Sequence, residues 1–394
     1  MPLAAQRLVA IDAFRGLTFI VMIWVNELGG VSGISRWLKH MPADSDAMSF
    51  PDIVFPAFLF IVGMSIPFAF ARRQQAGDGP WALARHTLER ALALVLMGLF
   101  MVNAEDGYNV AASGMPVALW SLLFYAAAAL CWGVYRFDDR PLLQRGLRLA
   151  GVLLLIGLAA LFHGGKDGSD WLRPQWWGIL GLIGWAYLLG CAVQGLTRGR
   201  LMPLLAAIAL CIGYYALHRL PGLGPLASAL LSQDAHAAHG AIVLCGMVCA
   251  QIFFDARRNA AVRQRFAEAL LFAAALALVG ATLRPAFGIS KIYATPSWCL
   301  YCAAICVLLF SALHALIDHR GRNGWLRWVA PAAANPLVTY LLPFIVLALM
   351  DLAGLSLPAP LHQGALGLLW AALYAALIVA LVSLLNRRNL RLQL

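Results

Sequence analysis

The sequence predicts an all-α fold, a polytopic transmembrane helical bundle of about 11 to 12 spans that forms one domain over residues 1–394. Two observations predict this class. Hydrophobic residues make up 62% of the chain and charged residues only 12%, whereas a soluble globular domain is nearer half apolar and a quarter charged. Apolar runs long enough to cross a bilayer, which takes about 20 residues each, also recur along the whole chain. A water-soluble enzyme is therefore excluded.

Twelve apolar runs, each bounded by charged residues or by Pro and Gly, are the expected spans. The region from 200 to 240 is open to two interpretations, because LPGLGPLASALLSQDAHAAHG also suits a re-entrant or interfacial segment. The expected spans cover residues 10–28, 52–71, 87–103, 115–135, 146–163, 176–196, 201–217, 240–255, 268–286, 297–317, 329–350 and 364–386.

The basic residues predict how the helices are oriented. With the N-terminus in the cytoplasm, 21 of the 29 Lys and Arg residues fall on the cytoplasmic side, seven fall on the outer side and Arg15 lies within the first span. Positive charge concentrates on the cytoplasmic side of membrane proteins, so both termini are expected in the cytoplasm. The net charge of +11 then follows from topology, and no nucleic-acid partner is needed to explain it.

Polar side chains in the first span are candidates for function, because polar groups are costly in a bilayer unless they are paired. Asp12 and Arg15 lie near its inner end, and Asn26 and Glu27 lie near its outer end. Asp12 and Arg15 suit either a local ion pair that anchors the helix or a functional site. Asn26 suits either an interhelical hydrogen bond or a functional role.

The loop between the first two spans, LGGVSGISRWLKHMPADSDAMSFPD, is long for a protein whose other connections are mostly short. Long loops at helix ends often carry function. His40 is the only side chain in this loop that ordinarily titrates near neutral pH, and Asp44, Asp46 and Asp52 follow it. A solvated loop histidine is one interpretation. A general base with carboxylates that orient it or bind a cation is the other.

Two later segments also place polar groups beside apolar helices. GISKIYATPSW at 288–298 carries Lys291 in a predicted outer loop, and AANPLVTYLLPF carries Asn335 in an apolar run. Packing and capping roles are alternatives to substrate contact for both residues.

We expect no metal site. The eight cysteines lie in apolar segments, where thiols pack as small hydrophobic groups. Cys299, Cys302 and Cys306 have helical spacing but no carboxylate or histidine neighbours, and His236 and His239 lack a third ligand in the sequence.

Together these motifs resemble the heparan-alpha-glucosaminide N-acetyltransferase family of membrane acyltransferases, in particular its bacterial members of the DUF5009 type. The segment MPADSDAMSFPD after His40, and MPVALW at 115–120, depart from the lysosomal branch and put the acceptor in question. The resemblance is strongest over the first two spans and patchy elsewhere. It is carried by IDAFRGLTFIVMIWVNELGG at 11–30, WLKHMPAD at 37–44, DIVFPAFLFIVGMSIP at 52–67, KIYATPSWCLY at 291–301 and AANPLVTY at 333–340.

The resemblance implies a reaction that crosses the membrane. Acetyl-CoA is taken from the cytoplasm, and its acetyl group is delivered to the amino group of a glucosamine unit on the far side. Carried over by motif position, the catalytic histidine is His40 and its partner is Asn26. Asp52 matches the acidic residue that opens the second span. Asp12 and Arg15 match the DAFRG block, which we expect on the side of the CoA co-substrate.

The resemblance also implies a multi-pass protein of the bacterial inner membrane, a homodimer, and glucosamine or a related amino sugar as the acceptor. Within the single domain, residues 1–71 are expected to form a catalytic helix pair with its outer loop, and residues 72–394 the remaining bundle.

Several mechanistic alternatives stay open at this stage. His40 either removes a proton from the acceptor amine or itself accepts the acetyl group. An amino-sugar secondary transporter and an O-acyltransferase that modifies an envelope polysaccharide are the competing functions. The expected substrate-binding residues are Glu27, Asp44, Asp46, Asp52, Lys291 and Asn335.

Overall fold

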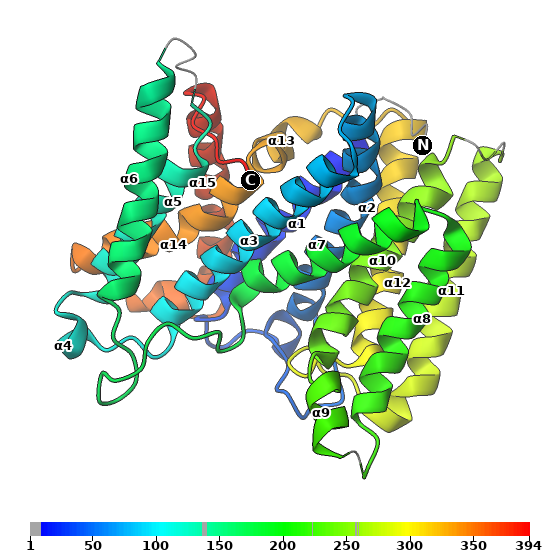
Figure 1. The fold of residues 1–394 in the computed structure, drawn as a ribbon, viewed down its shortest axis with the longest axis horizontal. Coiled ribbons are helices and arrows are strands. Elements are labelled where there is room, and N and C mark those ends of the chain that lie inside the picture. The colour runs from blue at the N-terminus through cyan, green and yellow to red at the C-terminus, as the bar shows by residue number, and fades with distance from the viewer. Residues whose placement is uncertain (1–8, 136–139, 223, 257, 259) are drawn as a thin grey trace. The chain divides into compact units, whose positions relative to one another are not determined.

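The computed structural model describes residues 9–394 except 136–139, 223, 257 and 259 (Figure 1). The described residues form helices and isolated bridges but no strand. This confirms the predicted all-α class.

Ten helical segments of the described chain are long and apolar enough to cross a membrane. A further pair, α13 (Leu326–Ala334) and α14 (Pro336–Leu352), passes the same test as one span bent by 86°. The ten segments are α1 (Val9–Leu28), η2 and α2 (Pro51–Ile53, Val54–Gln75), α3 (Pro80–Glu105), α6 (Pro141–Ala160), α7 (Gly178–Thr197), α8 (Leu201–His218), α9 and α10 (Pro225–Leu231, Asp234–Phe254), α11 (Val262–Phe287), α12 and η3 (Pro296–His314, Ala315–His319) and α15 (Gly364–Arg387).

Each of the twelve predicted spans coincides with a helical segment, but one of them is short. The predicted span 115–135 is α5 (Val117–Trp132), which has 16 residues. The uncertain region before residue 240 contains the short helix α9, and α10 begins at Asp234, earlier than the predicted residue 240. The remaining short helices are η1 (Arg36–Leu38), α4 (Val110–Ser113) and η4 (Ala359–His362).

The chain divides into two compact units that the sequence did not predict. Unit 1 comprises Met1–Thr18, Ser35–Ala91 and Ile183–Arg327, and unit 2 comprises Phe19–Ile34, Leu92–Leu182 and Trp328–Leu394. Four of the five boundaries fall within helices, namely α1, α3, α7 and α13, and the fifth lies in the loop after α1.

Unit 1 is built around α10, which packs against α2, α8, α11 and α12 and is buried along almost its whole length. Glycines allow α2 and α10 to touch backbone to backbone. A Cβ atom at Gly63 would lie 1.8 Å from the Val243 carbonyl oxygen, and one at Gly246 would lie 2.0 Å from that of Phe60. Small residues at such crossings are typical of membrane helices, because close van der Waals packing stabilises them.

Unit 2 packs α5 against α6 and α14, and α14 against α15. Aromatic rings fill its core: Trp120 stacks on Phe100 with ring centroids 5.5 Å apart, and its indole N–H donates to the Leu158 carbonyl at 3.1 Å. The hydrogen bond satisfies the polar end of an otherwise apolar ring.

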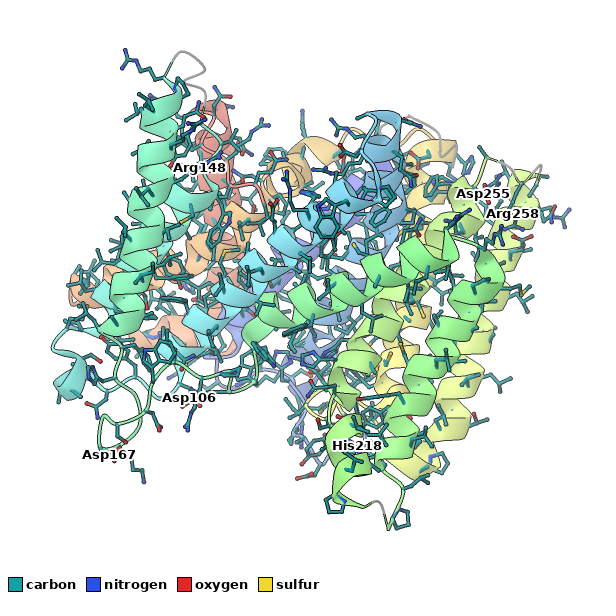
Figure 2. All side chains as sticks on the ribbon, viewed as in Figure 1. Asp106, Arg148, Asp167, His218, Asp255 and Arg258 are labelled. Carbon is teal, nitrogen blue, oxygen red and sulfur yellow. The ribbon has the colours of Figure 1, made fainter. Side chains whose placement is uncertain are left out.

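Each unit separates its charged residues between two ends. In Figure 2, His218 lies at one end of unit 1, and Asp255 and Arg258 lie at the other. In unit 2, Arg148 lies at one end, and Asp106 and Asp167 lie at the other (Figure 2). Within each unit, an arginine thus lies at the opposite end from the other labelled group: Arg258 from His218, and Arg148 from Asp106 and Asp167.

Candidate active site

The loop that carries His40 is shaped by two short helices in unit 1. Ser35 caps η1 by accepting a hydrogen bond from the Trp37 N–H at 3.4 Å, and the Phe50 N–H donates to the Trp37 carbonyl at 3.2 Å, which closes the loop on itself. η2 then begins at Pro51, whose fixed φ suits the first position of a helix. Asp52 follows immediately and is buried.

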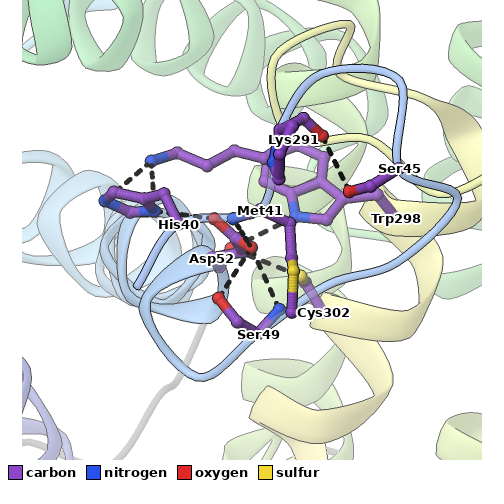
Figure 3. Close-up of polar contacts among 9 residues, drawn as sticks. His40, Met41, Ser45, Ser49, Asp52, Lys291, Trp298 and Cys302 are labelled. Atoms are coloured by element: carbon purple, nitrogen blue, oxygen red, sulfur yellow. Dashed lines mark hydrogen bonds and ion pairs between the residues drawn. The ribbon is translucent and has the colours of Figure 1, made fainter. Parts of the chain in front are cut away.

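Asp52 is the buried acid of the site (Figure 3). Its side chain is 1% exposed, whereas that of His40 is 46% exposed. One carboxylate oxygen contacts His40 Nδ1 at 2.7 Å. The other accepts from the Ser49 N–H at 3.0 Å, the Ser49 hydroxyl at 2.9 Å and the Met41 N–H at 3.3 Å. Four hydrogen-bond donors around one carboxylate stabilise its ionised form.

Helix α12 contacts the backbone of the same residue. The Trp298 indole N–H donates to the Asp52 carbonyl at 3.1 Å, and Cys302 Sγ lies 3.8 Å from that oxygen. Both side chains are fully buried. The position of Asp52 is therefore fixed by its own loop and by a helix that lies more than two hundred residues later in the chain.

The contact between Asp52 and His40 determines how the imidazole is protonated. Because an ionised carboxylate only accepts hydrogen bonds, Nδ1 carries the hydrogen when the ring is neutral. Nε2 then holds the lone pair and is the basic atom of the ring. A buried carboxylate that orients a partly exposed histidine is the arrangement that general-base catalysis requires.

Lys291 lies beside the imidazole, as Figure 3 shows. Its Nζ atom is 3.4 Å from His40 Nε2 and 3.2 Å from Nδ1. Nδ1 already carries a hydrogen for Asp52, and the nearly equal distances place the ammonium over the ring, close to both nitrogens. Burial lowers the pKa of Lys291, and the Asp52 carboxylate opposes part of this effect.

A tight turn between α11 and α12 holds Lys291 in place. The Ser290 N–H donates to Thr295 Oγ1 at 2.9 Å, the Thr295 N–H donates to the Ser290 carbonyl at 3.0 Å, and the Ala294 N–H donates to the Lys291 carbonyl at 3.1 Å. Ala294 has a φ of 48°, in the left-handed region that non-glycine residues rarely occupy. Such strain is found where the surrounding structure over-determines the backbone, often at functional sites.

Asp44 and Asp46 fasten the two loops of the site to each other. The Tyr293 hydroxyl donates to Asp44 at 3.0 Å, and the carboxylate raises the pKa of this phenol. Asp46 accepts from Arg284 Nε at 3.1 Å and from the Ile289 N–H at 2.8 Å. Asp46 is thus occupied by structural partners, and a direct contact with substrate stays a prediction.

The predicted residues Asn26 and Glu27 belong to unit 2. Asn26 is exposed near the outer end of α1. Glu27 accepts a hydrogen bond from the Trp370 indole at 2.8 Å, which ties α1 to α15. The catalytic role expected for Asn26 and the substrate contact expected for Glu27 stay predictions.

Asp12 and Arg15 form a local ion pair on α1, which was one of the two alternatives for these residues. Arg15 Nη1 donates to Asp12 at 2.8 Å, and Nη2 donates to the Ser65 hydroxyl on α2 at 3.0 Å. The anchoring role is therefore present. The role toward the CoA co-substrate stays a prediction.

Asn335 is buried at the break between α13 and α14 in unit 2. Its Nδ2 donates to Asn386 Oδ1 at 3.0 Å and to the Leu390 carbonyl at 2.9 Å, and its Oδ1 accepts from the Leu392 N–H at 3.5 Å. The chain itself thus satisfies the amide, which gives Asn335 a structural role, while the expected substrate contact stays a prediction.

Sequence reasoning missed several parts of the site. Ser49, Trp298 and Cys302 were not named as neighbours of Asp52. Only Ser49 had a local signal, because a Ser three residues before an Asp at a helix start suits side-chain capping. The two α12 residues come near Asp52 through tertiary packing. Among the described residues, no group of three or more His, Cys, Asp or Glu is placed to hold a metal ion.

The fold and the site define a class: a multi-pass helical membrane protein that carries a buried carboxylate and an accessible histidine in the loop between its first two spans. Residues 7–186 match a domain of unknown function, DUF5009. Over 101 residues, or 25% of the chain, it is 34% identical to heparan-alpha-glucosaminide N-acetyltransferase of Mus musculus. Over 98 residues it is 35% identical to the Homo sapiens protein of the same name.

These matches support membership of the family of the heparan-alpha-glucosaminide N-acetyltransferases. It covers only 14% of the length of each of these relatives. The DUF5009 match includes His40 and Asp52 but ends before Lys291. Both relatives are named as N-acetyltransferases.

Proposed function

We propose that this protein is a transmembrane N-acetyltransferase, which moves the acetyl group of cytoplasmic acetyl-CoA to the amino group of glucosamine or a related amino sugar on the outer side. The observation that carries the proposal is the Asp52–His40 pair, with 2.7 Å between Oδ1 and Nδ1 and with the acid buried beside the exposed base. The names of the relatives supply the type of reaction.

His40 has a chemical task in this reaction that suits its geometry. Attack on a thioester requires an amine without its extra proton, and the attacking nitrogen must lose a further proton as the amide forms. His40 Nε2 is the basic atom that takes a proton, and Asp52 stabilises the imidazolium that results. The same atom serves as the nucleophile if the acetyl group passes through the histidine.

We propose that the Asp44 carboxylate binds the amino group of the acceptor. Asp44 lies on the exposed loop that carries His40 and accepts a hydrogen bond from Tyr293. An amino sugar arrives partly as an ammonium ion, which a carboxylate attracts. Asn26 is proposed as the partner that orients His40 or donates to the thioester oxygen, on the strength of the family resemblance.

The position in the cell and the assembly are also part of the proposal. The charge distribution supports cytoplasmic termini and an outer position for the His40 loop. The resemblance to bacterial members of the family supports an inner-membrane homodimer.

The competing transporter function has less support. Inverted-repeat transporters contain broken helices at matching positions of two halves. The described residues contain one such bent pair, α13 and α14.

An acceptor panel tests the proposed function. The purified full chain in detergent is mixed with acetyl-CoA, and release of free thiol is followed with glucosamine, with N-acetylglucosamine, whose amine is blocked, and with glucose, which has only hydroxyls. We expect turnover with glucosamine alone and none with the His40→Ala variant. Turnover with all three sugars points to an O-acyltransferase, and turnover that survives in His40→Ala contradicts the proposal.

A further inference from the structure

Lys291 has no role in a mechanism that uses only the histidine and its acid, yet it lies within hydrogen-bond distance of the reacting nitrogen. Its Nζ is 3.4 Å from His40 Nε2. The groups that face it are His40 and Asp52 from the loop and η2, and Cys302 from α12. A lysine held this close to a base exchanges protons with it readily.

The turn that holds Lys291 is strained and is supported by several hydrogen bonds. The turn that carries it is strained at Ala294 and locked by Ser290 and Thr295. Two residues earlier, the Ile289 N–H donates to Asp46. A long, solvated lysine needs none of this support, because its four-carbon stem is flexible.

We infer that Lys291 is the proton donor to the sulfur that leaves the acetyl donor, and that His40 restores the proton to it. This inference rests on the proposed acetyl transfer and adds a residue to it. The ammonium lies where it is needed, since the acetyl group must come within reach of the acceptor amine whose proton His40 removes.

The step balances in atoms and charge. The acceptor nitrogen attacks the thioester carbon, and the new C–N bond forms as one N–H proton passes to His40 Nε2. The C–S bond breaks, its electron pair stays on sulfur, and Lys291 gives a proton to that sulfur. The imidazolium then passes its proton from Nε2 to the neutral Lys291 amine. The net products are the acetamide and free CoA thiol, with both side chains restored.

Burial prepares Lys291 for this role. An ordinary lysine holds its proton too tightly to be an efficient acid near neutral pH, and efficiency rises as the pKa of the acid approaches the working pH. Burial lowers the pKa of Lys291 in this direction.

A change of leaving group tests the inference. The full chain in detergent is assayed with three acetyl donors: acetyl-CoA, the acetyl thioester of N-acetylcysteamine, and S-phenyl thioacetate. The first two donors release an alkyl thiol, which benefits from a proton as it leaves. The third releases an aromatic thiolate, which is stable without one. The variants are Lys291→Met, which removes the charge and the proton, and Lys291→Arg, which keeps the charge but hardly ever gives up a proton.

Lys291→Met and Lys291→Arg are both expected to lower kcat/KM by about 100-fold or more with the alkyl donors, and by less than about tenfold with the aromatic donor. The alkaline decline of kcat/KM, which reports loss of the Lys291 proton in the native chain, should disappear in Lys291→Met. An equal loss with all donors, or near-native activity of Lys291→Arg with acetyl-CoA, overturns the inference.

The same assay separates this inference from the proposed function. His40→Ala is expected to be inactive with every donor whether or not Lys291 gives a proton. A fully active His40→Ala would contradict the acetyl-transfer mechanism itself, whereas equal losses in the Lys291 variants with an inactive His40→Ala would contradict only the role of the lysine.

Discussion

At the scale of single residues, Asp52 decides how the site works, because its buried carboxylate contacts the imidazole of His40 by a charge-assisted hydrogen bond. The sequence predicted His40 and Asp52 as candidates from the loop and the second span. It did not predict which of the three loop carboxylates meets the histidine. Asp44 and Asp46 are nearer to His40 in sequence, yet they contact Tyr293 and Arg284.

Replacement of Asp52 by Asn tests the orientation of the base. The amide that replaces the carboxylate has one oxygen and one NH2 group. Its oxygen suits the three donors at the Oδ2 position, which turns the NH2 group toward His40 Nδ1 and favours the wrong imidazole tautomer. We expect kcat/KM for acetyl transfer to fall by at least about 100-fold and the free energy of unfolding to fall by about 1–3 kcal/mol, because hydrogen bonds to a charged acceptor are lost. Enzyme assay and thermal denaturation in detergent measure the two effects.

Ser49→Ala is the graded control for this variant. It removes one of the three donors to Asp52 Oδ2 and keeps the Ser49 N–H and the Met41 N–H. We expect its kcat/KM to stay within about tenfold of the native value. If Asp52→Asn were no worse than Ser49→Ala, the carboxylate would not be needed to orient His40.

At the scale of elements, the two loops of the site act together because Asp46 joins them. The loop before α2 meets the end of α11 through the Asp46 contact with Arg284. It meets the turn before α12 through the Asp46 contact with the Ile289 N–H and through the Ala47 N–H, which donates to the Ile289 carbonyl at 3.2 Å. No helix pattern in the sequence predicts this pairing, because the partners lie more than two hundred residues apart.

Variants of Asp46 test whether this junction positions the site. Asp46→Asn keeps an oxygen for the Ile289 N–H and loses the ion pair, and Asp46→Ala loses both. The ion pair is exposed, so each change should alter stability by less than about 1 kcal/mol. We expect Asp46→Ala to lower kcat/KM roughly tenfold, because the catalytic groups shift, and Asp46→Asn to lower it less. Equal activity of the native chain and Asp46→Ala would show that the junction does not position the site.

The crossing of α2 and α10 gives a second prediction at this scale. Gly63→Ala would place a methyl group 1.8 Å from the Val243 carbonyl oxygen, and two packed backbones cannot both move away without cost. We expect a loss of at least about 1–3 kcal/mol of stability, or failure to obtain folded protein. The measurements are the yield of monodisperse protein and its Tm in detergent.

Gly213→Ala is the matched control for the crossing, because it adds the same methyl group within α8 where no atom lies within 4 Å. A helical Gly to Ala change in open space is neutral or mildly stabilising. Equal Tm values for Gly63→Ala and Gly213→Ala would contradict the close crossing.

At the scale of the whole molecule, the number of spans and the side of each terminus must agree. The described chain has ten long segments, or eleven candidate crossings when the bent pair counts as one span. Eleven crossings would place the termini on opposite sides. The charge distribution predicts that both termini are cytoplasmic, so a bent pair that crosses requires α5 to cross as well. With 16 residues, α5 is about 24 Å long, shorter than the hydrocarbon core of about 30 Å. The sequence located this span from its composition, but its length depends on where the helix ends in the structure.

Cysteine labelling tests the crossing by α5. Ala111→Cys lies before α5 and Arg140→Cys lies after the α5–α6 connection, and both positions are exposed. With a maleimide that does not cross membranes, we expect labelling of Ala111→Cys above the level of the parent chain in intact cells, and of Arg140→Cys only after the cells are opened. Labelling of both in intact cells would place α5 on one side of the membrane.

Transfer of acetyl across a sealed bilayer is the most direct test of the central claim. The full chain is reconstituted into vesicles that contain glucosamine, acetyl-CoA is added outside, and N-acetylglucosamine is measured inside after the vesicles are washed. We expect product inside the vesicles with the native chain and none with His40→Ala. Product that forms only when both substrates are on the same side of the membrane, or product with His40→Ala, would contradict the proposed transfer.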